Sequence, residues 1–315
     1  MAKPMTKRER VEAVLAHGRP DRPPFSFWYH FPSDRVAGEA CARAHLDHYR
    51  RHRVDFLKVM NDNGYPGPAG GVASASDLGR VEPQTASAPE FERQLEALRL
   101  IGEELGGETL FITTIFGPLS VLGSLSGKGA VDLLEADREA AGSALGAIAE
   151  TLAAFAGACV AAGAAGVFMS CSDRELCGRL GRGAYAELVK PHDLTVLAGA
   201  AGAPMNVVHV HERSAAFDAF LDYPVSVLNC ADRADGPSIS DVRGRFGGVM
   251  MCGMDHVGTI VEGTGVDLAT EILDAVEQAG EAPFIVGPGC SFPSDTPESK
   301  LGMVYETLAT AEEGA

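Results

Sequence analysis

The sequence has few basic residues for its length. Lysine and arginine together number 26, against 43 aspartates and glutamates in 315 residues, which gives a formal net charge of −17. A chain of this charge repels nucleic acid and anionic membrane surfaces, so neither is expected as a partner. A substrate with several anionic groups would be held only where arginines are concentrated locally.

Long apolar runs and a secretory leader are also lacking. No stretch of about 18 or more consecutive apolar residues occurs, which argues against a membrane span. The charged start MAKPMTKRERVEAVL has no apolar segment of the kind found in signal peptides. Seven cysteines, an odd number spread along the chain, favour reduced thiols over a disulfide framework. These features predict a cytoplasmic protein.

The sequence is rich in apolar residues, and these recur with a regular spacing along the chain. Hydrophobic residues make up 46%, and no linker rich in proline, glycine or serine separates two compositions, so residues 1–315 are expected to form one domain. A first helix is predicted over residues 6–18, with Thr6 as its N-cap and Gly18 at its end. The small, polar segment 61–88 is expected to be a loop over one end of the fold.

Short apolar runs then alternate with longer stretches of helical periodicity. Strands are predicted at residues 25–31, 56–60, 109–116, 166–171, 205–211, 225–230, 248–254 and 283–290. Helices are predicted at residues 37–53, 89–105, 131–162, 184–200, 213–221, 238–246, 266–279 and 297–312. Eight strands, each followed by a helix, indicate a single (β/α)₈ TIM barrel with an N-terminal helical extension. A doubly wound open sheet is the alternative.

Two histidines with one residue between them stand at the end of the apolar run MNVVHVHE. On a strand, alternate side chains point to the same side, so His209 and His211 are predicted to share one face. Two ring nitrogens on a rigid strand provide half of a metal site. The alternative is a strand with one buried and one surface histidine and no metal.

Polar or metal-binding residues follow nearly every predicted strand, where a barrel of this kind carries its active site. Those proposed as metal ligands are His209, His211, Cys230 and Cys290. A mixed set of nitrogen and sulfur donors suits zinc. Cys290 lies in GPGCSFPSDTP, where glycine and proline on both sides indicate a tight turn that exposes the thiol, whereas the alternative is a small buried side chain. Cys171 and Cys252 are expected to be packing residues.

Several segments together resemble the uroporphyrinogen decarboxylase superfamily. They are the opening TKRERVEAVLAHGRPDRPP and then DFLKVMNDNGY (55–65), VVHVHE (207–212), YPVSVLNCADR (223–233), GTGVDLATEI (263–272) and GPGCSFPSDTPESKLGMV (287–304). The resemblance implies one (β/α)₈ domain with a deep cleft. It also implies one of two chemistries, which are cofactor-free decarboxylation of uroporphyrinogen and zinc-dependent methyl transfer to a thiol.

The methyltransferase branch is the closer of the two. The decarboxylase branch has an arginine-rich segment after its first strand, where WYHFPSDR offers only Arg35. Corrinoid:thiol methyltransferases bind zinc through a His-x-Cys and a distant cysteine. His209 matches that histidine and Cys290 the distant cysteine, while His211 stands where those enzymes have cysteine. The family's weaker fourth ligand falls on Cys230 or Asn229.

The leading hypothesis is a zinc-dependent methyl- or alkyltransferase that activates a thiol substrate, with a methyl-corrinoid on a partner protein as one candidate donor. Catalytic roles, either in binding the substrate or in transferring protons, are assigned to Asp62, Asp255 and His256. Substrate binding is assigned to His30, Asn61, Asn63 and Asp173. The alternatives are a metal-independent decarboxylase or lyase acting on a small carboxylate, and a non-catalytic metal- or corrinoid-binding accessory protein. The sequence does not identify the thiol or the alkyl donor. It also leaves the oligomeric state open, with a homodimer as one of the alternatives.

Overall fold

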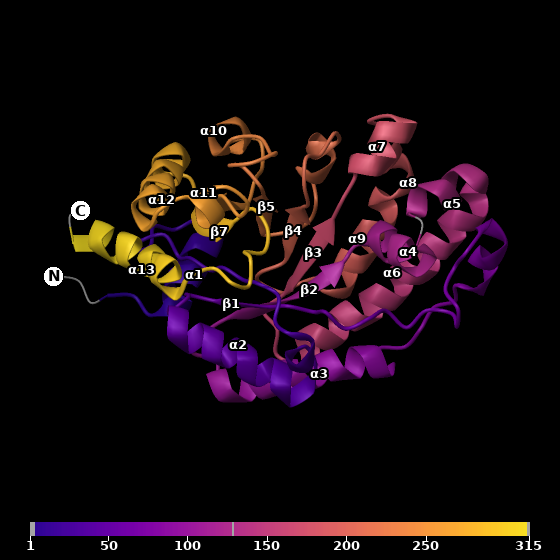
Figure 1. Ribbon diagram of the computed structural model, residues 1–315, viewed down its shortest axis with the longest axis horizontal. Helices are drawn as coiled ribbons and strands as arrows, with labels where there is room; N and C mark the ends of the chain where they lie inside the picture. The colour runs from indigo at the N-terminus through magenta and orange to yellow at the C-terminus, as the bar shows by residue number, and fades with distance from the viewer. Residues whose placement is uncertain (1–3, 128, 314–315) are drawn as a thin grey trace.

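The computed structural model describes residues 4–127 and 129–313 and shows an α/β fold built on one parallel sheet (Figure 1). The sheet has seven strands, which are β1 (Leu57–Val59), β2 (Phe111–Phe116), β3 (Val167–Cys171), β4 (Val207–Val210), β5 (Val227–Cys230), β6 (Val249–Met254) and β7 (Phe284–Pro288). Each strand pairs in parallel with the next strand along the chain. All the carboxyl ends therefore lie at the same edge of a curved half-barrel.

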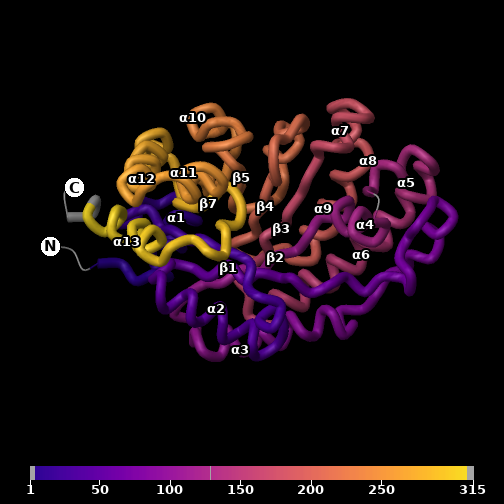
Figure 2. The backbone as a smooth tube through the Cα atoms, in the orientation of Figure 1, coloured from indigo at the N-terminus to yellow at the C-terminus, as the bar shows by residue number. Residues whose placement is uncertain are grey.

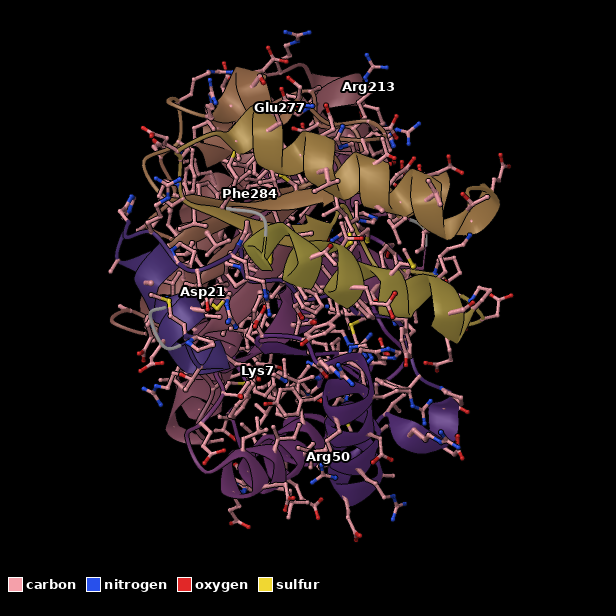
Figure 3. The ribbon with its side chains drawn as sticks, turned by 90° about the vertical axis from the view of Figure 1, so that its left-hand side faces the viewer. Lys7, Asp21, Arg50, Arg213, Glu277 and Phe284 are labelled. Atoms are coloured by element: carbon pink, nitrogen blue, oxygen red, sulfur yellow. The ribbon has the colours of Figure 1, made fainter. Side chains whose placement is uncertain are left out.

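Helices connect the strands and cover the outer face of the sheet. They are α1 (Lys7–Leu15), α2 (Gly38–His52), α3 (Pro89–Leu105), α4 (Pro118–Ser126), α5 (Ala130–Ala136), α6 (Arg138–Ala161), α7 (Arg174–Leu180), α8 (Ala184–Leu188), α9 (Lys190–Gly199), α10 (Ile239–Val242), α11 (Thr259–Glu262), α12 (Gly265–Ala279) and α13 (Glu298–Glu313). Short 3₁₀ turns occupy η1 (Ser33–Arg35), η2 (Ala75–Arg80) and η3 (Phe217–Phe220). Figure 3 shows α12 and α13 running alongside each other over one side of the molecule.

The predicted first strand, residues 25–31, is not a strand in the structure. Its backbone lies between β7 and the start of β1. Ser26 N–H donates to Val286 O of β7 (3.1 Å), and Asp55 N–H, just before β1, donates to Phe25 O (2.9 Å). Only isolated bridges form, at Phe25 and Tyr29. The reason is local: Phe25 N–H donates to the buried Asp55 carboxylate (2.9 Å) instead of to a neighbouring strand. The segment, traced in Figure 2, thus occupies the gap between β7 and β1 without regular pairing.

The predicted helices were confirmed where the apolar pattern is long. The predicted helix 131–162 is two helices, because the Asp137 side chain accepts from Ala140 N–H (3.0 Å) and caps α6. The predicted helices 213–221 and 238–246 were too long, since only η3 and the four-residue α10 form there. The prediction also missed α4, although Pro118 at its first position is a typical start signal.

Alternation along the strands divides the core into two layers. One apolar cluster fills the interior of the half-barrel and includes Phe56, Ile112, Phe168, Val207 and Met251. The other fills the space between the sheet and the helices. Within the described residues, α6 is the one helix long and apolar enough to cross a membrane. Half of its most apolar stretch is buried, and it packs against α9 and α4 as a core helix does.

Candidate metal centre

Two strands bring three metal-binding side chains together at the carboxyl edge of the sheet. His209 lies in β4, His211 follows directly after it, and Cys290 lies two residues beyond β7. One ligand atom from each lies within 4.8 Å of the other two. The period-two prediction for the histidines holds, since their rings face each other with centroids 5.5 Å apart.

The turn before Cys290 depends on a glycine. A Cβ placed at Gly289 would lie 2.6 Å from Ala231 Cα and 3.0 Å from His256 Nδ1, so a larger residue would push the turn away from β5. Gly289 N–H also donates to Met254 O (3.1 Å), which fixes the turn against β6. The Cys290 thiol therefore follows a turn that is fixed against the ends of both β5 and β6.

The distances between the donor atoms suit a tetrahedral zinc ion. His209 Nε2 and His211 Nδ1 are 3.3 Å apart, and Cys290 Sγ is 3.6 Å from His211 Nδ1. Zinc–nitrogen bonds of about 2.05 Å and a zinc–sulfur bond of about 2.3 Å at the tetrahedral angle require donor separations of about 3.3 Å and about 3.6 Å. Two nitrogens and one sulfur leave a fourth position for a substrate atom, as in catalytic zinc sites.

Asn229 fixes the orientation and tautomer of His209. Its Nδ2 donates to Met251 O (2.5 Å) and Pro288 O (3.0 Å), which leaves Oδ1 as the atom that faces the histidine. His209 Nδ1–H donates to that oxygen at 2.5 Å. Since a neutral imidazole carries one N–H, Nε2 keeps its lone pair and points into the cluster. Such a partner behind a histidine ligand strengthens metal binding.

The same histidines change the acidity of the thiol. Burial alone would raise the pKa of Cys290, but the neighbouring His209 and His211 outweigh burial and lower its pKa to about 4. The hydrogen bond to Cys290 in turn raises the pKa of His211. A lowered pKa favours the thiolate, which is the form in which cysteine binds metals.

The three residues of the cluster line a cavity of about 690 Å³. Four of the predicted substrate or catalytic residues line it, namely His30, Asn61, Asp62 and Asn63. His30 Nδ1 lies 2.9 Å from Asp62 Oδ1, and this hydrogen bond is the main cause of a raised His30 pKa. Among the residues that the structure describes, no arginine lines the cavity.

The other predicted site residues lie away from this cavity. Cys230 faces the helix-side core, because Asn229 takes the inward face of β5. The Asp173 carboxylate accepts from Ala215 N–H (2.9 Å) and Ala216 N–H (2.7 Å), which anchors the loop after β4. Asp255 N–H donates to Glu271 (2.7 Å), and its carboxylate accepts from Val257 N–H.

His256, predicted as catalytic, is beside the cluster but does not line the cavity. Its Nδ1 is buried without a hydrogen-bond partner, and burial lowers its pKa. Cys171 is a packing residue, as predicted, and its thiol lies 3.7 Å from the buried Asp193 carboxylate.

Sequence reasoning missed Lys58, which lines the cavity although it is almost fully buried. A lysine in the middle of the apolar run FLKVM was the available signal, since a lysine is rarely buried without a partner. It also missed Trp28 and Phe168, whose rings lie beside the lysine.

Comparison with known proteins identifies the family of this chain. Residues 56–310 match the family described as uroporphyrinogen decarboxylase (URO-D). The chain belongs to the uroporphyrinogen decarboxylase family. No curated protein matches it. The resemblance noted in the sequence is thus confirmed at the level of the family.

Solved structures share the fold of this family member at low sequence identity. A methyltransferase from Methanosarcina mazei superposes with a TM-score of 0.75 at 16% identity, over 98% of this chain and 99% of that chain. A B12-independent methionine synthase from Shewanella sp. W3-18-1, in complex with selenomethionine, gives 0.62 at 12% identity, over 93% and 98%. A putative vitamin-B12 independent methionine synthase from Listeria monocytogenes gives 0.52 at 14% identity, over 81% and 73%. At these identities the likeness establishes the fold alone.

Proposed function

We propose that this protein is a zinc-dependent methyl- or alkyltransferase whose ion is held by His209, His211 and Cys290. The observation that carries the proposal is that two of the three donor separations, 3.3 Å and 3.6 Å, match the tetrahedral spacing of zinc ligands, while all three donors lie within 4.8 Å of one another. A bound zinc ion would supply a Lewis acid that lowers the pKa of an incoming thiol. The descriptions of the structural neighbours as a methyltransferase and methionine synthases agree with this chemistry.

The protein's own residues would prepare and position the thiol. Asn229 holds His209 with Nε2 directed at the cluster. The His30–Asp62 pair lines the same cavity, and a histidine whose charged form is stabilised by a carboxylate is suited to accept the thiol proton. Asn61 and Asn63 line the same cavity and are held there by hydrogen bonds from Asn61 Nδ2 to Thr114 O and from Asn63 Nδ2 to Gln94 Oε1, so that a substrate would meet their remaining polar atoms.

The identity of the alkyl donor is a separate question from that of the metal centre. A methyl-corrinoid carried by a partner protein is one candidate. Two of the three structural neighbours are described as B12-independent, so the comparison does not favour a corrinoid over another donor. Uroporphyrinogen is excluded from the proposal, because no arginine lines the cavity to bind its carboxylates.

Metal analysis tests the metal centre directly. Protein prepared without a histidine tag should contain about one zinc per chain by inductively coupled plasma mass spectrometry. His209→Ala and Cys290→Ser should each lose the zinc and keep the circular dichroism spectrum of the wild type. Cys230→Ala is the matched control, since it removes a thiol from a neighbouring strand end that faces the helices. Zinc below about a tenth of an equivalent, without recovery on adding zinc, would contradict the proposal.

A further inference from the structure

We propose that Lys58 binds the single anionic oxygen group of a ligand whose apolar body fills the part of the cavity lined by Phe91, Phe155 and Leu152. This inference deepens the proposed function by naming a substrate class, an amphiphilic monoanion, and it rests on that function only for the reaction at the metal centre. Lys58 is not one of the proposed metal ligands.

Lys58 points into the half-barrel from the middle of β1. It stands between Phe56 and Met60, which both belong to the interior cluster, and period-two alternation gives all three the same face. Its relative exposure is 3%. A lysine at this position carries its charge into the apolar interior instead of extending it to solvent, which is costly unless the charge has a partner.

The partners that surround the ammonium group are weak. Lys58 Nζ lies 2.9 Å from the Met60 thioether, 4.5 Å from the Phe168 ring centroid and 5.1 Å from the Trp28 ring centroid. A thioether is a poor acceptor, whereas ring faces favour a cation. Among the described residues no carboxylate lies within ion-pair distance of this nitrogen. The Lys58 ammonium group therefore has N–H donors that lack a strong acceptor, and no carboxylate among the described residues pairs with it.

The anions nearest to the cavity are already engaged. Asp62 is bound by His30 at 2.9 Å, and the Cys290 sulfur is 3.6 Å from His211. Burial lowers the pKa of Lys58 to about 7, and the nearby Cys290 and Asp62 oppose this effect only in part. An anionic ligand would supply the missing countercharge and favour the ammonium form. Among the described residues the lining has one lysine and no arginine, which suits a ligand with one anionic group better than one with several.

Much of the lining of the same cavity is apolar. Phe91 and Phe155 stack with ring centroids 4.1 Å apart, and Val121 and Leu152 also line the cavity. A volume of about 690 Å³ is that of a site for a drug-sized molecule, well beyond the size of a small thiol acid. The ligand should therefore combine one anionic group with an apolar or aromatic body.

A pair of thiol-free probes tests the anion site independently of the metal. 3-Phenylpropionate and 3-phenyl-1-propanol differ only in the carboxylate, and their binding is measured by isothermal titration calorimetry on metal-free and zinc-loaded protein. Wild type should bind the acid at least about tenfold more tightly than the alcohol, since a hydrogen bond to a charged group is worth that much. Lys58→Met should lose this preference by weakening the acid alone, and Lys58→Arg should keep most of it.

Each result bears on the inference. Equal binding of acid and alcohol by wild type, or an unchanged preference in Lys58→Met, would overturn it. Lys58→Gln is a second neutral variant, which gives the same comparison should the methionine variant not fold. Zinc content measured on the same samples separates the two proposals. If wild type binds zinc but shows no preference for the acid, the Lys58 proposal is wrong. If wild type prefers the acid but binds no zinc, the proposal of a metal centre is wrong.

Discussion

His209 and Asn229 are joined by a hydrogen bond of 2.5 Å between Nδ1 and Oδ1, across neighbouring strands whose Cα atoms are in register. Because Asn229 Nδ2 is committed to two backbone carbonyls, the amide cannot turn over. The histidine is thereby held in the tautomer that leaves Nε2 free for a metal.

Removal of this hydrogen bond should weaken zinc binding without abolishing it. Asn229→Ala leaves the three donors in place but frees the ring of His209, so zinc affinity should fall about 10- to 100-fold. Competition with a chromogenic chelator measures this change. Unaltered affinity would show that the β4–β5 hydrogen bond has no effect on the metal.

Cys230→Ala, one residue along the same strand, should keep zinc affinity at the wild-type value. The Cys230 side chain lies in the helix-side core, so its removal leaves a small cavity and lowers the free energy of unfolding by about 1 kcal/mol. Chelator competition and urea denaturation measure the two effects. A large loss of zinc would place the sulfur in the coordination sphere after all.

His211→Cys should keep zinc and increase the thiolate character of the site. His211 follows β4 directly and its side chain is partly exposed, so the smaller cysteine can be accommodated, and it gives the His-x-Cys pattern of the thiol methyltransferases. X-ray absorption at the zinc edge should then show two sulfur neighbours where the wild type shows one. A spectrum with one sulfur in both proteins would indicate that position 211 is not a ligand.

Lys58→Met should stabilise the metal-free protein, since it removes a buried charge that lacks an anion. Burial lowers the Lys58 pKa from 10.5 to about 7, so the unfolded chain binds the proton more tightly than the folded one. The gain, on the order of 2 kcal/mol, should be complete below about pH 7 and should shrink as the pH rises towards about 10.

Denaturant unfolding of wild type, Lys58→Met and Lys58→Arg across this pH range measures the effect on stability. The arginine variant keeps the charge and should show no gain. A methionine variant less stable than wild type at neutral pH would mean that the ammonium group has a partner in the folded protein.

Asp62→Asn should lower the pKa of His30. The hydrogen bond that the His30 ring donates to the Asp62 carboxylate is the largest cause of the raised His30 pKa, and an amide cannot stabilise the imidazolium in the same way. Nuclear magnetic resonance titration of the His30 ring reports the change, and zinc content should stay constant. An unchanged titration would remove Asp62 from the proposed proton-transfer pair.

Much of the metal centre could be predicted from the sequence. The H-x-H spacing places His209 and His211 on one face of any strand, because side chains alternate with period two. The GPGC turn after an apolar run places Cys290 beyond a strand end. Strand positions from residue 56 onward followed from the apolar runs, and the family followed from the motifs.

Tertiary structure decided which neighbours these residues have. The run VSVLNC is apolar on both faces, as strands of a covered parallel sheet are, so it could not show that Asn229 faces inward and Cys230 outward. That choice depends on register with β4 and β6. In the same way, the buried Asp55 carboxylate takes the N–H of Phe25 and leaves residues 25–31 without regular pairing. Local pattern fixes the side-chain period, whereas packing between distant segments fixes which face becomes the interior.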